Sequence, residues 1–318
     1  MSADTPDHGR EAALKVAAHY ERWPFPGGDH GGREGFLFVR RLTEWCAEPS
    51  ATGERPRVLD AGCGTGHTTL ALARRLPGAD FLGVDVSTAS IEVARRLVEQ
   101  QEVANVSFEV ADIAASDPSA AVPSEGSFRA VLALGVLHHV PDREVALDNI
   151  VGSLEPGGHL ALWLYGLHGR RAHALHQKFI RLLAGPDASD SELARFGLAF
   201  VESLGEQYLP ASGVYTPVED RGSPAGWLSR HPEWLADQMF PAYERPVDLD
   251  GILDLLESRA LELEEWLGVP EEPERWTGEP VLRERLAALP RFERLRAVEC
   301  LLKPAYYFVT ARPGGNTA

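Results

Sequence analysis

The feature that most constrains this chain is an apolar segment that runs directly into alternating glycines. Residues 58–61 (VLDA) have the composition of a buried strand, and Gly62, Gly64 and Gly66 follow at alternate positions. Because glycine lacks a Cβ, such a turn can adopt positive φ and approach a ligand closely. A helix that begins after the turn would direct its N-terminus, which favours negative groups, at the same ligand. The segment therefore predicts a strand, a ligand-binding turn and a helix.

The same alternation continues along the chain. Short β-branched runs predict strands at 57–61, 80–84, 107–110, 129–134 and 159–165, and amphipathic stretches predict helices at 69–76, 90–99 and 143–154. A helix at 249–259, a strand at 261–267 and a closing strand at 305–311 follow later. Parallel strands joined by crossover helices have this pattern, so we predict an α/β fold.

Three segments lie outside this alternation. Helices are expected at 9–22 and 35–46, separated by Pro24, Pro26 and several glycines, so residues 1–50 are assigned to an N-terminal helical lid. Residues 167–245 are assigned to a helical insertion, with helices near 172–183 and 191–204. The core then comprises 51–166 and 246–312, with a second helical insertion at about 270–303 that contains a helix at 281–301. Disorder is expected only in the first ten residues and in 313–318.

Composition excludes several classes of function. The formal charge of −16 and the absence of a dense Lys/Arg cluster disfavour a nucleic-acid partner. No apolar run approaches the roughly 18 residues that cross a membrane, so no membrane partner is expected. The N-terminus lacks the features of a secretory signal, and Cys46, Cys63 and Cys300 form neither a disulfide framework nor a metal pattern. We therefore expect a cytoplasmic protein that acts on a small molecule.

A second chemical signal is Asp85, at the carboxyl end of the second predicted strand. A carboxylate at this place can accept hydrogen bonds from both hydroxyls of a ribose and discriminates against a 2′-phosphate. The third glycine of a nicotinamide-type fingerprint would stand one residue later, where this chain has His67. The pattern therefore argues against a dehydrogenase.

With Asp85, the segment 59–66 resembles motifs I and II of the class I S-adenosylmethionine-dependent methyltransferases. Residues 110–113 (VADI), 134–140 (LGVLHHV) and 154–158 (LEPGG) resemble later motifs of that family in the same order. The matches cover about a third of the chain. They imply a Rossmann-like, seven-stranded, mostly parallel sheet with an antiparallel last strand.

The resemblance also implies a set of contacts with S-adenosyl-L-methionine. Asp60 and the backbone from Gly62 to Gly66, including Cys63 and Gly64, would contact the methionine moiety, and Asp85 would bind the ribose. Contacts with adenine would come from Val86, Asp112 and Ile113. The carbonyl of Leu134 or of Gly135 would accept a hydrogen bond from the methionine ammonium. A purely loop-capping role for Asp112 is the alternative.

Catalytic candidates follow the fourth predicted strand. His138 or His139 could take a proton from an acceptor, with His138 favoured, whereas the alternative is that one caps a turn and the other packs beneath the loop. In the N-terminal segment, Tyr20, Trp23 and Phe25 form an aromatic cluster that suits a lid, and Tyr20 is a candidate contact of the methionine end. The alternative is that these rings only pin the N-terminal helix.

The insertion at 167–245 is rich in aromatic and imidazole side chains that suit the wall of a pocket for an aromatic acceptor. They are His168, His173, His176, Tyr208, Tyr215, Trp227, His231, Trp234, Met239, Phe240 and Tyr243. A homodimer interface is the alternative role of such a segment. The histidines lack the spacing of a metal site on one helix, so no metal is expected.

These observations predict transfer of a methyl group to an oxygen or nitrogen of a small, specialised metabolite, with release of S-adenosyl-L-homocysteine. Rival hypotheses are methylation of a protein or RNA, a cofactor-assisted cyclase or isomerase, and a non-catalytic S-adenosylmethionine-binding or regulatory protein.

Overall fold

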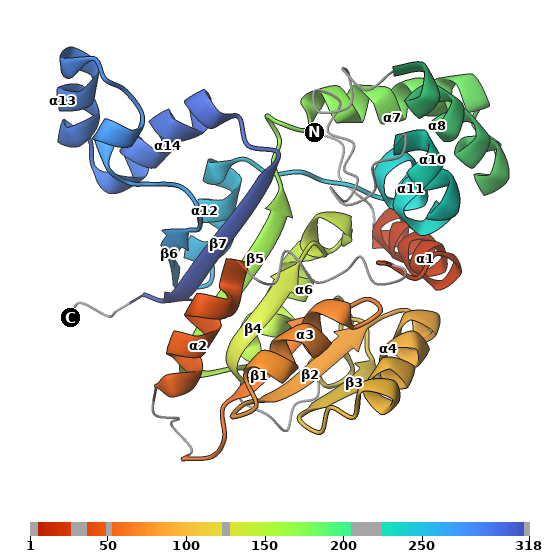
Figure 1. Cartoon of the computed structure of the whole chain (residues 1–318), viewed down its shortest axis with the longest axis horizontal. Coiled ribbons are helices and arrows are strands. Elements are labelled where there is room, and N and C mark those ends of the chain that lie inside the picture. Colours follow the sequence, from red (N-terminus) through yellow and green to blue (C-terminus); the bar gives the residue numbers. More distant parts are fainter. Residues whose placement is uncertain (1–5, 27–36, 49–52, 123–127, 205–223, 315–318) are drawn as a thin grey trace.

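The computed structural model describes residues 6–26, 37–48, 53–122, 128–204 and 224–314. Its centre is a seven-stranded sheet with the order β3-β2-β1-β4-β5-β7-β6 (Figure 1). The strands are β1 (Arg57–Ala61), β2 (Asp80–Asp85), β3 (Val106–Val110), β4 (Phe128–Leu134), β5 (Leu154–Tyr165), β6 (Leu261–Trp266) and β7 (Tyr306–Pro313). Strand β7 pairs antiparallel with both β5 and β6, and the pairs from β3 to β5 are parallel. The predicted fold class is confirmed.

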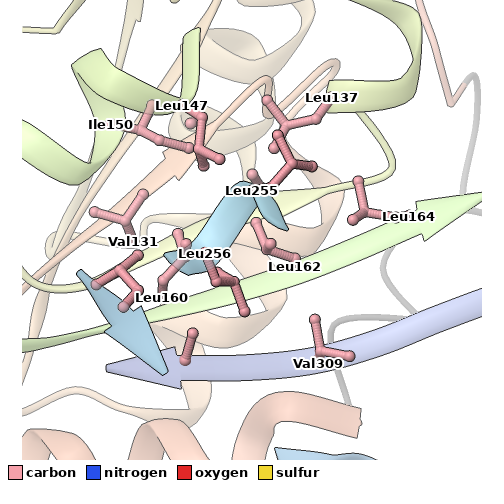
Figure 2. Packing of buried hydrophobic residues seen from close by; sticks show 14 of the residues in the cluster. Val131, Leu137, Leu147, Ile150, Leu160, Leu162, Leu164, Leu255, Leu256 and Val309 are labelled. Carbon is pink, nitrogen blue, oxygen red and sulfur yellow. The ribbon is translucent and has the colours of Figure 1, made fainter. Parts of the chain in front are cut away.

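Helices cover both faces of the sheet because successive residues of the central strands point to opposite sides. On one face, Val131 of β4 and Leu160, Leu162 and Leu164 of β5 pack against α6 (Arg143–Gly152) and α12 (Leu249–Glu257), as Figure 2 shows. On the other face, a second cluster joins the intervening strand residues to α2 (Val39–Ala47) and α3 (His67–Arg75). Helix α4 (Thr88–Gln101) covers β2 and β3. Because strands β1 to β5 are parallel, their carboxyl ends lie at one edge of the sheet. Ligands of such folds bind at this edge.

The remaining helices lie at the periphery of the sheet. They are α1 (Pro6–Arg22), α5 (Pro118–Ala121), α7 (Arg171–Ala184), α8 (Asp190–Leu204), α10 (Pro224–Arg230), α11 (Pro232–Met239), α13 (Pro280–Ala288) and α14 (Arg291–Leu302), with short 3₁₀ turns at Leu137–His139 and Pro273–Arg275. Helices α7, α8, α10 and α11 share a separate hydrophobic cluster around Trp227, Trp234 and Phe240. Figure 1 shows α1 beside this group. Within the described ranges, no helix combines the length and apolar character that crossing a membrane requires.

The structure corrects three predicted element boundaries. Residues 6–10 are helical, although disorder was expected there; residues 1–5 lie outside the described ranges. The helix expected over 281–301 is two helices, because Pro290 cannot donate a backbone hydrogen bond and stands at the N-cap of α14.

The third correction concerns the fifth strand, which begins at Leu154 rather than at His159. Leu154 already pairs with Phe128, and the register then shifts so that Ala130 pairs with His159. Gly157 has a φ of 78°, so the Pro-Gly-Gly turn forms an irregularity inside the strand instead of preceding it.

Candidate active site

The turn after β1 is built around three glycines with positive φ. Gly62, Gly64 and Gly66 have φ values of 78°, 53° and 77°. The N–H groups of Gly62 and Cys63 both donate to the carbonyl of Val84, at 2.8 and 2.9 Å, so the turn folds back over the end of β2. The turn that the sequence predicted is therefore present at the carboxyl edge of the sheet.

Close neighbours explain why two of these positions exclude a side chain. A Cβ on Gly62 would press into the Val136 side chain, and one on Gly64 would collide with the carbonyl of Phe25. That same carbonyl accepts a hydrogen bond from Thr65 N at 3.0 Å, and Thr65 Oγ1 donates to Pro26 O at 2.6 Å. The segment after α1 is thus docked directly on the glycine turn.

Gly66 has a different role from the other two glycines. It is the N-cap of α3, and a Cβ there would meet Ala94 and the ring of Phe108. It is not among the residues that line the cavity described below. The contact with the cofactor that the resemblance implied for Gly66 therefore finds no counterpart in the geometry, which gives this residue a packing role.

Two carboxylates flank the turn, Asp60, which is buried, and Asp85, which is partly buried. Asp85 accepts hydrogen bonds from Gly64 N and Ser87 N, both at 2.9 Å; burial raises its pKa, and these backbone donors act in the opposite direction. Asp60 accepts a bond from Thr69 Oγ1 at 2.6 Å, and burial raises the pKa of Asp60 to about 6. Asp85 is therefore oriented by the loop itself. The raised pKa of Asp60 makes its protonation state sensitive to the charge of a bound ligand.

A single cavity joins most of the predicted site residues. It spans about 1340 Å³ of empty space, a figure that includes its open mouth. The residues implied as cofactor contacts that line it are Tyr20, Asp60, Gly62, Cys63, Gly64, Asp85, Val86, Asp112, Ile113 and Leu134. Asp112 also caps its own loop, because its Oδ1 accepts from Ala114 N at 2.9 Å. The acidic group at the ribose position and the apolar pair Val86 and Ile113 fit an adenosyl cofactor.

The two candidate histidines have different environments. His138 is fully buried, stacks on the ring of Tyr165 with centroids 3.6 Å apart, and accepts a bond from Tyr165 N on its Nδ1. Burial lowers the pKa of His138 well below its ordinary value, and this residue does not line the cavity. His139 does line it. The favoured base of the sequence analysis is therefore packed beneath the site, and its neighbour faces the cavity.

His139 is held in one orientation by its backbone surroundings. Its Nδ1 lies 2.8 Å from the carbonyl of Tyr243, which can only accept, so Nδ1 carries the hydrogen and Nε2 carries the lone pair in the neutral ring. Nε2 lies 3.6 Å from Asp237 Oδ1 and has no hydrogen-bond partner among the described residues. Nε2 is therefore a buried nitrogen without a hydrogen bond among the described residues, in a ring that lines the cavity.

Asp237, on α11, is a site residue that the sequence analysis missed. It lines the cavity while being only 4% exposed, and its two oxygens accept hydrogen bonds from Tyr20 OH at 3.0 Å and Tyr165 OH at 3.4 Å. Burial, with the carboxylate of Asp237, raises the pKa of both tyrosines well above the usual value, so both remain donors. A weak signal existed, because Asp237 is the only acidic residue between Glu233 and Glu244 in an otherwise apolar segment.

Tyr165 is held in place from both sides. The guanidinium of Arg170 lies 3.7 Å from the ring centroid, and His138 stacks on the ring as described. Arg170 is buried and forms an ion pair with Glu244, with Nη2 and Oε2 2.9 Å apart. This stack fixes the hydroxyl of Tyr165 toward Asp237.

Helix α1 crosses the cavity and is attached at both of its sides. The hydroxyl of Tyr20 donates to Asp237 on α11, and the carboxylate of Glu21 accepts from Ser87 Oγ at 2.9 Å and from Ala89 N at 3.1 Å. Phe25 lines the cavity, with its ring centroid 4.8 Å from that of Trp234, whereas Trp23 does not line the cavity and packs against the cluster of the insertion. The aromatic cluster therefore both covers the cavity and pins the helix.

Few of the expected wall residues of the insertion reach the cavity. Trp234 lines it, but the other described members of that set do not. His173, for example, is buried with Nε2 2.7 Å from the carbonyl of Gln238, and Trp227 stacks on His231. Tyr208 and Tyr215 lie outside the described residues. The expectation that these side chains wall the pocket is therefore wrong for most of them, because they form the core of the insertion itself.

Comparisons with known proteins agree with this geometry. The sequence profile of a family described as a methyltransferase domain matches residues 58–158. An uncharacterized protein of Synechococcus is 28% identical over 299 residues, covering 90% of this chain and 68% of that protein. A ubiquinone biosynthesis O-methyltransferase of Alkalilimnicola ehrlichii is 35% identical over 155 residues, covering 48% of this chain and 58% of that protein.

A solved structure is similar over most of the chain. PKMT2 of Rickettsia typhi in complex with AdoHcy superposes with a TM-score of 0.62 at 17% sequence identity, covering 93% of this chain. The match spans only 55% of the PKMT2 chain, and at this identity the likeness concerns the fold. The matched domain, the sheet order and the cavity at the glycine turn together identify an S-adenosylmethionine-dependent methyltransferase domain in this chain.

Proposed function

We propose that this chain transfers the methyl group of S-adenosylmethionine to a hydroxyl oxygen of a small molecule, with His139 as the general base. The observation that carries the proposal is the lone pair of His139 Nε2, which has no hydrogen-bond partner among the described residues and belongs to a ring that lines the cofactor cavity. A hydroxyl must lose its proton around the transition state, whereas a neutral amine can attack first. A base placed here therefore favours oxygen over nitrogen.

The cofactor, when bound, supplies a methyl group on a sulfonium, and the residues of the chain hold it and move the proton. Asp85 would bind the ribose hydroxyls, Val86 and Ile113 the adenine ring with Asp112 at its amino group, and the backbone at residues 62–64 the methionine moiety. The acceptor oxygen would take the methyl carbon, the electron pair of the broken carbon–sulfur bond would remain on sulfur, and the part of the chain would be to align the acceptor hydroxyl and to accept its proton. The hydroxyl proton passes to Nε2 of His139.

The support around His139 suits this role. The Tyr243 carbonyl fixes the tautomer, and Asp237, 3.6 Å from Nε2, would stabilise the imidazolium that forms. General bases of this kind contribute about 100-fold to 10,000-fold in rate. His138, packed against Tyr165, acts as part of the scaffold.

The helices that cover the cavity, α1 and α11, favour a small acceptor over a macromolecule. Helices α1 and α11 are joined across the cavity by Tyr20 and Asp237, and Trp163, Tyr165 and Trp234 supply aromatic surface. We propose that the segment 167–245 serves as a substrate cap and that the acceptor is a ring-containing metabolite, including specialised metabolites. The similarity to an O-methyltransferase of ubiquinone biosynthesis supports an oxygen acceptor, and the charge of −16 weighs against RNA.

The test uses S-adenosylmethionine with a ¹³C-labelled methyl group. The purified chain is incubated with it and a small-molecule extract, and labelled products are found by mass spectrometry and their methyl carbons characterised by NMR. An O-methyl carbon, absent when His139→Gln replaces the wild type, is the expected result. Label on a nitrogen, on protein or on RNA would contradict the proposal, as would the absence of any labelled product.

A further inference from the structure

The cavity is acidic and contains no fixed positive charge among the described residues. Four carboxylates line it, from Asp60, Asp85, Asp112 and Asp237, and neither a lysine nor an arginine is among the described lining residues. The first three lie at the ends of β1 to β3, where the adenosyl and methionine groups would bind. Asp237 comes from α11 and is not explained by the family motifs.

The hydrogen bonds that Asp237 accepts in the described structure come from neutral donors, the hydroxyls of Tyr20 and Tyr165. His139 Nε2, 3.6 Å away, is uncharged in the neutral tautomer described above, and Arg170, which stacks on Tyr165, is paired with Glu244. A carboxylate that is 4% exposed and accepts no hydrogen bond from a cation among the described residues is costly to bury. A ligand that brings a positive charge into this end of the cavity would therefore be stabilised.

A series of contacts links Asp237 to the glycine turn. The Val136 side chain abuts Gly62, the N–H of His139 donates to Val136 O at 2.8 Å, and His139 Nε2 faces Asp237 at 3.6 Å. These successive contacts connect the methionine-binding turn to the carboxylate. With the methionine moiety at the turn, the transferable methyl group would lie in this region.

We propose that Asp237 is the counter-charge of the cofactor's sulfonium and makes the site prefer S-adenosylmethionine to S-adenosylhomocysteine. The two molecules differ by one methyl group and one positive charge, so the carboxylate attracts the substrate form and not the thioether product. The same carboxylate then faces His139. In the proposed reaction one positive charge leaves sulfur and one appears on the imidazole, so the net charge beside Asp237 is unchanged.

The test needs no methyl acceptor, so its outcome is separate from that of the proposed function. Dissociation constants of S-adenosylmethionine and S-adenosylhomocysteine are measured by calorimetry for the wild type and for Asp237→Asn, which retains the size of the side chain. Loss of one charge interaction at an effective dielectric near 20 to 40 predicts that the ratio of the two affinities shifts by about 10-fold toward S-adenosylhomocysteine. Circular dichroism checks that the variant is folded.

Tyr20→Phe is the matched control, because it removes a hydrogen bond to Asp237 but leaves the charge. It should change both affinities by the same factor and leave their ratio intact. If Asp237→Asn weakens both ligands equally, Asp237 only holds the cover in place and the proposal is overturned. An unchanged ratio with unchanged affinities overturns it as well.

The wild type alone provides a second measurement should Asp237→Asn fail to fold. Its probes are two cofactor analogues, one with a protonated nitrogen and one with a neutral carbon in place of sulfur. The charged analogue should bind about 10-fold more tightly. Equal affinities would refute the proposed counter-charge.

Discussion

Replacing Asp85 by alanine tests the cofactor half of the site most directly. The carboxylate is partly buried and already oriented by Gly64 N and Ser87 N at 2.9 Å, so part of its desolvation belongs to the folded state and is not repeated when ribose binds. A hydrogen bond to a charged acceptor contributes about 1.5 to 3 kcal/mol. Losing the equivalent of one such bond raises the dissociation constant of S-adenosylhomocysteine by roughly 10-fold to 100-fold.

The assay is isothermal titration with S-adenosylhomocysteine on folded protein. Asp80→Ala is the matched control, because Asp80 begins the same strand at the opposite edge of the sheet and its side chain is 47% exposed beside Arg55. It should leave the affinity unchanged. If Asp85→Ala binds within about twofold of the wild type with the same melting temperature, Asp85 does not bind the ribose and the assignment of the cavity fails.

Three further predictions concern other parts of the site. His139→Gln should lower the single-turnover rate of methyl transfer by about 100-fold or more while the affinity for S-adenosylhomocysteine stays within about threefold, and an equal loss of both would argue against a base. Gly64→Ala should lower the melting temperature and weaken cofactor binding, because its φ is positive and its Cβ would collide with Phe25 O, whereas Gly78→Ala, which meets no atom, should do neither. Burial raises the pKa of Asp60 to about 6, and the methionine ammonium favours the ionised carboxylate, so cofactor binding should release a proton and should weaken as the pH falls below 6. Calorimetry in two buffers of different ionisation enthalpy measures the proton release. Asp60→Asn should abolish both the proton release and this pH dependence.

Much of the fold could be predicted because its signals are local. Strands β1 to β4 begin and end within about a residue or two of the predicted positions, since each is a short apolar run bounded by turn residues. The residues of the cofactor site could be predicted for the same reason, because Gly62 and Gly64 lie in the turn just after β1 and Asp85 is the last residue of β2. The predicted element boundaries were wrong where a single residue interrupts an otherwise continuous pattern. Pro290 divides the helix predicted at 281–301, and Gly157 lies in an irregularity inside β5.

The part of the cavity around Asp237 and His139 depends on contacts between segments that are far apart in the sequence. The spacing of apolar residues along the chain carries no information about such contacts. Asp237 meets Tyr20 across 217 positions of sequence. The choice between His138 and His139 rests on how the short 3₁₀ turn at Leu137–His139 orients two adjacent rings, one beneath the loop and one toward the cavity. Composition could suggest an aromatic insertion, but it could not distinguish Trp234, which lines the cavity, from Trp227, which packs in the insertion core.

The predicted cofactor contacts lie mainly on the sheet, whereas the proposed acceptor contacts lie partly on the helices that cover it. This separation affects how the acceptor preference of such a chain can change. The groups around the glycine turn and Asp85 belong to strand ends that the whole sheet holds in register, so substitutions there alter folding as well as binding. Asp237 and Trp234 belong to α11, whose helical neighbours have a hydrophobic cluster of their own. Exchange of that segment between related chains could therefore yield new acceptor preferences while the cofactor machinery is inherited unaltered.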